Sequence, residues 1–245
     1  MPHGIKIVSV NIECNRHYER LFPFIADEKP DVICLQEVLE QDIPQISKTF
    51  ALVGQLAPME RLTEARFSAQ GLHGQVFGIA LFTRFPATFQ TKYYCGAPET
   101  IPWQKPNNQG VNEMLLITEF KHDEKPYRIG TTHFTWTPDG EASDAQREDM
   151  STLLTILSGF PDMVFCGDFN APRGGEIWEK LAARYTDNIP ATYRSSLDRA
   201  LHRAGHLEHV VDGLFSTPEY RVSDVRLVEG VSDHKAVVGY VERIG

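Results

Sequence analysis

Residues 31–38 read DVICLQEV, an apolar run in which Gln36 and Glu37 stand near the end. A run of this length, rich in apolar and β-branched side chains, indicates a buried strand. Glu37 is the only acidic residue within VICLQEV, residues 32–38. A lone carboxylate in an apolar strand is costly unless it is paired or binds a metal. The segment predicts a functional carboxylate at a strand end. It leaves open a buried glutamate bonded to nearby backbone N–H groups.

Strand and helix patterns alternate on both sides of this segment. Residues 16–27 place Leu21 and Ile25 on one helical face, and residues 141–158 give the clearest helix. Strands are predicted at 5–11, 75–83, 85–93, 112–122, 126–134, 162–167, 210–215, 220–228 and 235–241, with a short helix at 40–50. Residues 58–74 and 96–110 are loop-rich. Strands in both halves with helices beside them predict an α/β fold of two sheets packed face to face, formed by a single domain over residues 1–245.

The composition is that of an ordinary soluble globular protein. Hydrophobic residues make up 42% and charged residues 23% of the 245 residues. The formal charge is −9, from 24 Lys and Arg against 33 Asp and Glu, and no basic run is present. This argues against a protein that coats DNA. An acidic enzyme that reaches phosphate through a bound divalent cation remains compatible with this charge.

The four cysteines contain no CxxC pair, and Cys34 and Cys166 lie in apolar runs. We expect reduced thiols and a cytoplasmic protein. The first residues lack a signal-peptide pattern, and no segment approaches about 18 consecutive apolar residues, so no membrane span is expected. The oligomeric state is open, with a monomer favoured.

Polar residues stand at the ends of five predicted strands, in the stretches SVNIE, LQEV, THF, GDFN and SDH. Ligand sites prefer such edges, because strands hold their ends rigidly while loops stay open. An oxygen-rich set of Glu37, Asn11 and one further carboxylate suits Mg²⁺ or Mn²⁺. The strand ends therefore predict a metal site.

Asp168 and Asn170 are two residues apart, so in an extended segment they point the same way. The carboxylate could then orient and deprotonate a water, and the amide could donate to a phosphoryl oxygen. An Asx-turn after a strand is the alternative.

Two histidines stand beside predicted strand ends. His234, after Asp233, could donate to a phosphate oxygen, with Asp212 keeping it charged; a capped turn is the alternative. His133 could protonate a leaving oxygen or stabilise the transition state, although a lone strand-end histidine is more often structural.

Other residues allow two interpretations each. The sequence also contains the spacing HxxxHxxH, formed by His202, His206 and His209, which on a helix would resemble a zinc site. Gly205 would interrupt such a helix, so we favour histidines that flank the cleft or lie on the surface. Trp136 follows His133 by three and either lines the cleft, where it could stack on a base, or is a partly buried core or rim aromatic.

The order Asn, Glu, His, Asp-x-Asn, Asp-His resembles the endonuclease/exonuclease/phosphatase superfamily from residue 5 to residue 241, in SVNIE, DVICLQEV, FGIALFTRFP, GTTHF, CGDFNAP, VDGLF and SDHKAV. The resemblance implies a four-layer α/β sandwich: two mixed β-sheets packed face to face, helices outside, and the active site at one end. Two departures are Glu13, where many members carry Asp, and VDGLF, where Asp-Tyr is commoner.

The same resemblance implies roles for individual residues. Glu37 would be the main ligand of Mg²⁺ or Mn²⁺, with Asn11 close by and Asp233 completing a metal or water shell. Asp168 would activate the water and Asn170 would hold the phosphate or the water. His234, oriented by Asp212, would contact the phosphate, and His133 matches a position where many members keep histidine.

The reaction implied is a single in-line attack of water on phosphorus, without a covalent intermediate. The favoured substrate is a phosphodiester in nucleic acid or a nucleic-acid adduct, such as single-stranded or damaged nucleic acid. The alternative is a small phosphoester, such as an inositol phosphate, a nucleotide or a phospholipid head group. A non-catalytic module that binds phosphate or a partner is a third hypothesis, which the intact set of catalytic positions disfavours.

Overall fold

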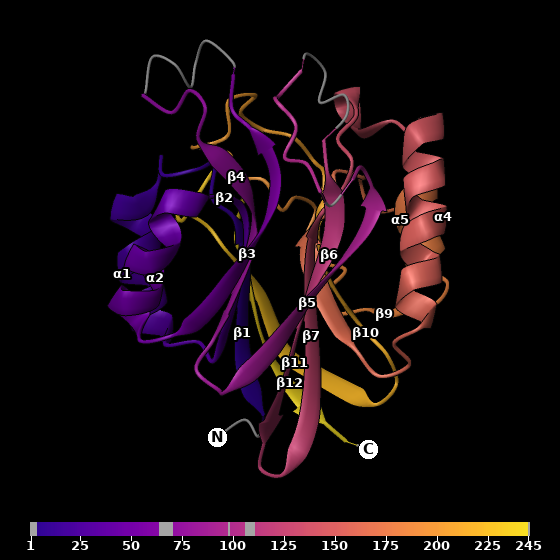
Figure 1. Cartoon of the computed structure of the whole chain (residues 1–245). Helices are drawn as coiled ribbons and strands as arrows, with labels where there is room; N and C mark the ends of the chain where they lie inside the picture. Colours follow the sequence, from indigo (N-terminus) through magenta and orange to yellow (C-terminus); the bar gives the residue numbers. More distant parts are fainter. Residues whose placement is uncertain (1–3, 64–70, 98, 106–110, 245) are drawn as a thin grey trace.

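The computed structural model describes residues 4–63, 71–97, 99–105 and 111–244. Two six-stranded sheets pack face to face, with helices on their outer faces (Figure 1). This confirms the four-layer α/β sandwich. Within the described residues, no helix is both long and apolar enough to cross a membrane.

Sheet A has the strand order β11-β12-β1-β2-β4-β3. Its strands are β1 (Ile5–Asn11), β2 (Val32–Leu39), β3 (Val53–Arg61), β4 (Val76–Thr83), β11 (Tyr220–Val228) and β12 (Ala236–Arg243). The helices α1 (Tyr18–Glu28) and α2 (Ile43–Phe50) cover its outer face, with the short 3-10 turn η1 (Glu40–Asp42) before α2 (Figure 1). The sheet is mixed, because β1 pairs parallel to β2 and antiparallel to β12.

Sheet B has the strand order β5-β6-β7-β8-β10-β9. Its strands are β5 (Ala87–Cys95), β6 (Glu113–His122), β7 (Lys125–His133), β8 (Val164–Asp168), β9 (Thr186–Asp187) and β10 (Asp212–Ser216). The helices α4 (Asp144–Ser158) and α5 (Glu176–Ala182) lie outside it, and a 3-10 turn, η3 (Pro138–Gly140), precedes α4 (Figure 1). Only β7 and β8 pair in parallel among its named strands.

The strands of sheet A are apolar on both faces because both faces are covered. Ile7 and Cys34 belong to the core cluster that includes sheet B, while Val8 and Ile33 belong to the cluster that packs against α1 and α2. Burial on both sides explains why the sequence of these strands is continuously apolar rather than alternating.

Among the described residues, the sequence did not predict the strands β3 and β9, the helix α5 and the 3-10 turn η3. The strand β3 lies at the edge of sheet A and contains Pro58, beside a register shift between Pro58 and Glu60. Proline is tolerated in edge strands and at bulges, so the turn-like composition here hides a strand. Residues 64–70, 98 and 106–110 of the two predicted loops lie outside the described residues.

Asp162, just before β8, joins the two sheets. Its carboxylate pairs with Arg128 of β7 and, at 2.6 Å, with Nη1 of Arg243 of β12. Burial alone would raise the pKa of Asp162, but the hydrogen bonds and charges of the two arginines outweigh it and lower that pKa. The ionised carboxylate therefore stabilises the fold.

We expect Asp162→Asn to lower the free energy of unfolding at pH 7 by about 1–3 kcal/mol. A lowered folded-state pKa stabilises the protein above the unfolded value, about 3.9, and that stabilisation disappears as the pH falls through the folded value. Urea unfolding at pH 7 and near pH 3 should show the difference between wild type and variant shrinking in acid. A difference that stayed constant would mean that the charge of Asp162 does not contribute.

Candidate active site

Strand ends from both sheets meet at one end of the sandwich. Asn11 ends β1 beside Gln36 of β2, and His133 ends β7 opposite Asp168 of β8. The antiparallel β10 starts where β8 ends, so Asp212 also lies opposite Asp168. This register, and not any single motif, brings the predicted residues together.

Asn11 connects the sheets across the site. Its Nδ2 donates to Oε1 of Glu37 and to Oδ2 of Asp168, each at 3.2 Å. Its Oδ1 accepts the backbone N–H of Glu13 at 3.1 Å. Both ends of the amide are thus used, and the two carboxylates are held in a fixed relation.

Glu37 sits on a β-bulge. Its φ is 58°, and the pairing of β2 with β4 shifts register between Leu35 and Val38. A bulge re-aims a side chain, and that of Glu37 lies at the site with 23% of its surface exposed. Among the described residues no backbone N–H donates to this carboxylate, so the purely structural interpretation lacks its donors.

The surroundings of Glu37 make its charged form costly when no cation is present. Loss of water on burial raises the pKa of Glu37, and the negative charge of Asp233 raises it further, while His133 acts in the opposite direction. A bound cation relieves the repulsion between two neighbouring carboxylates. The oxygen donors of Glu37, Asp233 and Asn11 fit the ligand preference of Mg²⁺ or Mn²⁺.

Asp168 is buried, with 2% of its side chain exposed. Oδ1 accepts the backbone N–H of Asn170 at 2.8 Å, which is the Asx-turn considered above. Oδ2 lies 3.6 Å from Nε2 of His133 and 3.7 Å from Nε2 of His234. Oδ1 therefore stabilises the turn after β8, and Oδ2 faces the site.

Asn170 departs from the extended geometry predicted for it. Its φ is 48°, a left-handed conformation, because the Asx-turn reverses the chain directly after β8. The side-chain Nδ2 donates to the carbonyl of Phe134 at 2.8 Å. An amide group has two N–H donors, and Nδ2 of Asn170 has no second acceptor among the described residues, so one donor is left for a ligand.

His234 and Asp212 form a buried pair, with Nδ1 of the histidine 2.8 Å from Oδ2 of the aspartate. Burial alone would lower the pKa of His234, but the charges of Asp212 and Asp168 raise it well above its ordinary value. The neighbouring carboxylates therefore favour the charged form of His234. The oxygen of Ser196 accepts the backbone N–H groups of Val211 and Asp212, which fixes the start of β10.

His133 faces the two carboxylates from sheet B. Its Nε2 is 3.9 Å from Oε1 of Glu37, in addition to its contact with Asp168. Its buried Nδ1 has no hydrogen-bond partner within the described part of the chain. A packing role would normally satisfy a buried ring nitrogen, so this orphan favours a functional position.

Asp233 lies beside Glu13 and His17. Ligand atoms of these three side chains are within 4.8 Å of one another. His17, which stands immediately before α1, was not predicted; its spacing of four residues from Glu13 is a weak sequence signal.

The three histidines of HxxxHxxH do not form a zinc site in the structure. Residues 201–209 contain no helix, so the spacing does not place them on one face. The ring of His202 lies 6.4 Å from that of His234, which places it beside the site, whereas His206 is exposed and lies 3.9 Å from Glu208.

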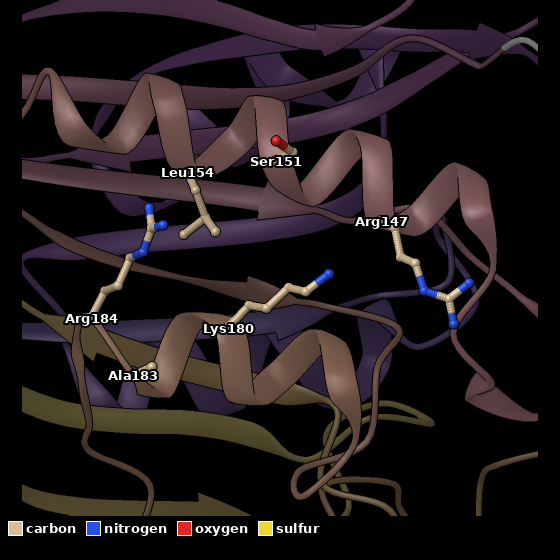
Figure 2. A pocket seen from close by; sticks show the side chains of 6 residues that line it. All are labelled: Arg147, Ser151, Leu154, Lys180, Ala183 and Arg184. Atoms are coloured by element: carbon tan, nitrogen blue, oxygen red, sulfur yellow. The ribbon is translucent and has the colours of Figure 1, made fainter.

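A hollow of about 360 Å³ lies elsewhere, between α4 and α5 (Figure 2). Its lining residues are Arg147, Ser151, Leu154, Lys180, Ala183 and Arg184. Arg147 and Lys180 are already paired with Glu176, and none of the strand-end residues contributes to it. The polar strand ends, not this hollow, carry groups suited to catalysis.

A family model described as "Endonuclease/Exonuclease/phosphatase family" matches residues 8–234. The chain belongs to the endonuclease/exonuclease/phosphatase family. Members of this family are hydrolases of phosphoesters that depend on divalent metals. The candidate acidic and histidine site described above is consistent with that dependence.

Solved structures of the endonuclease/exonuclease/phosphatase family share the fold. A family protein from Beutenbergia cavernae has 17% identity and a TM-score of 0.75, over 100% of this chain and 72% of that chain. A mannosyl-6-phosphatase of Bacteroides thetaiotaomicron has 12% identity and a TM-score of 0.71, over 97% and 99%. The catalytic domain of human Nocturnin, with bound sulfate, has 19% identity and a TM-score of 0.69, over 98% and 93%. A comparison with curated proteins found no match.

Proposed function

We propose that this chain is a phosphodiesterase, dependent on Mg²⁺ or Mn²⁺, that acts on nucleic acid or a nucleic-acid adduct. The observation that carries the proposal is the position of Asp168. One oxygen of this buried carboxylate faces Asn11, His133 and His234 at 3.2, 3.6 and 3.7 Å. A carboxylate held among donors in this way is suited to orient a water and to accept its proton. Both sheets supply site residues, so we propose one catalytic domain over residues 1–245.

The remaining residues act on the phosphate. His234, kept charged by Asp212, donates through Nε2 to a non-bridging phosphoryl oxygen. His133 donates to the leaving oxygen or stabilises the charge that develops on it. The free donor of Asn170 holds the phosphate or the water. Glu37, with Asn11 and Asp233 close by, would hold the divalent cation, which would supply positive charge near the phosphoryl oxygens when bound.

Two exposed tryptophans favour a substrate with bases. Trp136 follows β7, and 37% of its surface is exposed. Trp103 is 54% exposed and forms an isolated β-bridge with Arg61. Arg61 ends β3 and pairs with Val76, the first residue of β4. Both tryptophans lie toward the catalytic end of the sandwich. An aromatic platform that stacks on a base contributes about 1–3 kcal/mol per base. The net charge of −9 favours a short or single-stranded substrate.

A small phosphoester is the second candidate, because the fold is shared with a mannosyl-6-phosphatase and the chain has no basic run. Competition separates the two candidates. A single-stranded oligonucleotide should inhibit hydrolysis of bis-p-nitrophenyl phosphate at lower concentration than inositol phosphates or nucleotides do. The reverse order would favour the small substrate.

We expect Glu37→Gln to raise the Mg²⁺ concentration for half-maximal activity by about tenfold or more, because an amide is a weaker ligand than a carboxylate of the same shape. The measurement is hydrolysis of bis-p-nitrophenyl phosphate over a Mg²⁺ titration. Glu40→Gln is the matched control, since Glu40 is exposed three residues away and should behave like wild type. Activity that persisted in EDTA, or an unchanged metal dependence in Glu37→Gln, would refute the metal assignment.

A further inference from the structure

Ser196 connects the two parts of the chain that carry Asp212 and His234. It is fully buried, with 0% of its surface exposed. Its backbone N–H donates to the carbonyl of His209 at 2.9 Å, and its own carbonyl accepts the N–H of Lys235 at 2.7 Å. The main chain of this one residue therefore fixes the segment before β10 and the segment before β12 relative to each other.

The hydroxyl group of Ser196 is used completely at the start of β10. Its Oγ accepts the N–H of Val211 at 2.9 Å and that of Asp212 at 3.0 Å. A hydroxyl group has two acceptor lone pairs and one proton to donate, so only the proton is left. Burial raises the pKa of Asp212, and the hydrogen bond of its carboxylate with Ser196 is among the contacts that act in the opposite direction. The serine thus donates its proton to this carboxylate.

The carboxylate of Asp212 carries this contact on to His234. Oδ2 of Asp212 lies 2.8 Å from Nδ1 of His234, and Leu197, the residue after Ser196, forms an isolated β-bridge with His234. A carboxylate bonded to one ring nitrogen holds an imidazole in one tautomer and one orientation. Such a carboxylate must itself be held, and the hydroxyl group of Ser196 supplies a bond that does so.

A serine that only satisfies two buried N–H groups is the simpler explanation. The neighbouring Ser195 has a local role of that kind, because its Oγ accepts the N–H of Leu197 at 3.1 Å and donates to the carbonyl of the same residue at 3.3 Å. Ser195 is also buried, with 9% of its surface exposed. Ser196 differs in that its hydroxyl group contacts the carboxylate that orients His234. The two serines can therefore separate the two explanations.

We infer that Ser196 is a positioning residue, which sets the tautomer and the ring orientation of His234 through its hydrogen bond to the carboxylate of Asp212. The inference rests on the proposed function only for the contact between Nε2 of His234 and a phosphoryl oxygen. The connection from Ser196 through Asp212 to His234 does not depend on the substrate.

Nuclear magnetic resonance of the full chain with ¹⁵N-labelled histidine tests this connection without measuring activity. The signals of His234 are identified by their absence from the spectrum of His234→Gln. Ser196→Ala should shift the ring ¹⁵N signals of His234 and make its Nδ1 proton exchange with water about tenfold faster or more. Ser195→Ala is the matched control and should leave these signals like those of wild type.

Two results would overturn the inference: unchanged His234 signals in a folded Ser196→Ala, or equal changes in Ser195→Ala. Thermal unfolding shows whether Ser196→Ala is folded. If it is not, Ser196→Cys, in which a thiol of similar size is a weak donor, must show the same shift and the same faster exchange.

Hydrolysis of bis-p-nitrophenyl phosphate separates this inference from the proposed function. Ser196→Ala should lower kcat by about tenfold or more and leave KM near that of wild type, because a misplaced His234 loses contact with the charge that develops in the transition state. Ser195→Ala should retain the wild-type kcat. A wild-type protein without turnover would contradict the proposed function, and the resonance result alone would then decide the role of Ser196.

Discussion

Asp168→Asn should reduce kcat for bis-p-nitrophenyl phosphate by about 10³-fold or more, while the chain stays folded. The amide oxygen of asparagine can still accept the N–H of Asn170, the bond that Oδ1 makes at 2.8 Å. The other position becomes an NH₂ group that faces the donors of Asn11, His133 and His234. The variant keeps the shape of the loop and loses the proton acceptor.

The control for this variant is Asp123→Asn. Asp123 lies in the turn between β6 and β7, its side chain is 87% exposed, and its φ of 50° is one that asparagine tolerates. The same chemical change there should leave both activity and the free energy of unfolding near wild type. Urea unfolding of Asp168→Asn shows whether lost activity reflects lost fold. Activity close to wild type in a folded Asp168→Asn would remove Asp168 from the mechanism.

The strand-end pattern predicted which residues lie near one another in the structure better than it predicted their geometry. Apolar runs that end in Asn11, His133 and Asp168 place each of these residues at a strand end, because strands in a sandwich core must be apolar. Glu37 lies two residues before the end of β2. Their contact depends on register, with His133 and Asp212 both opposite Asp168. Register is set by tertiary pairing, so the register of these strands could be learned only from the family resemblance or from the structure.

Departures from regular backbone were the features that the sequence did not predict. The bulge that aims Glu37 and the left-handed turns at Glu13 and Asn170 occur at non-glycine residues with φ of 58°, 46° and 48°. Such conformations are uncommon for these residues and are imposed by surrounding hydrogen bonds. His17 was also missed, because the sequence pattern does not show that its side chain lies beside Glu13 and Asp233.

Gly167→Ala should have the largest effect on stability, lowering the free energy of unfolding by about 3 kcal/mol or more. Gly167 precedes Asp168 in β8 and has a φ of 143°. A Cβ atom there would lie 1.9 Å from the carbonyl oxygen of Thr132, its pairing partner in β7. That oxygen is backbone in a buried strand and cannot turn aside, so β7 and β8 must separate. Because His133 and Asp168 are the next pair, kcat should fall together with stability.

Gly174→Ala separates the clash from the strain of the backbone. Gly174 also has a positive φ, 86°, but a Cβ atom added there would meet no atom within 4 Å. Its cost is the strain of a left-handed alanine alone, about 1–2 kcal/mol. Urea unfolding of both variants therefore measures the clash with Thr132 as the excess loss in Gly167→Ala. Equal losses in the free energy of unfolding would show that the strands absorb the added methyl group. If Gly167→Ala then also retained activity, the positions of His133 and Asp168 would not depend on the close approach of β7 and β8.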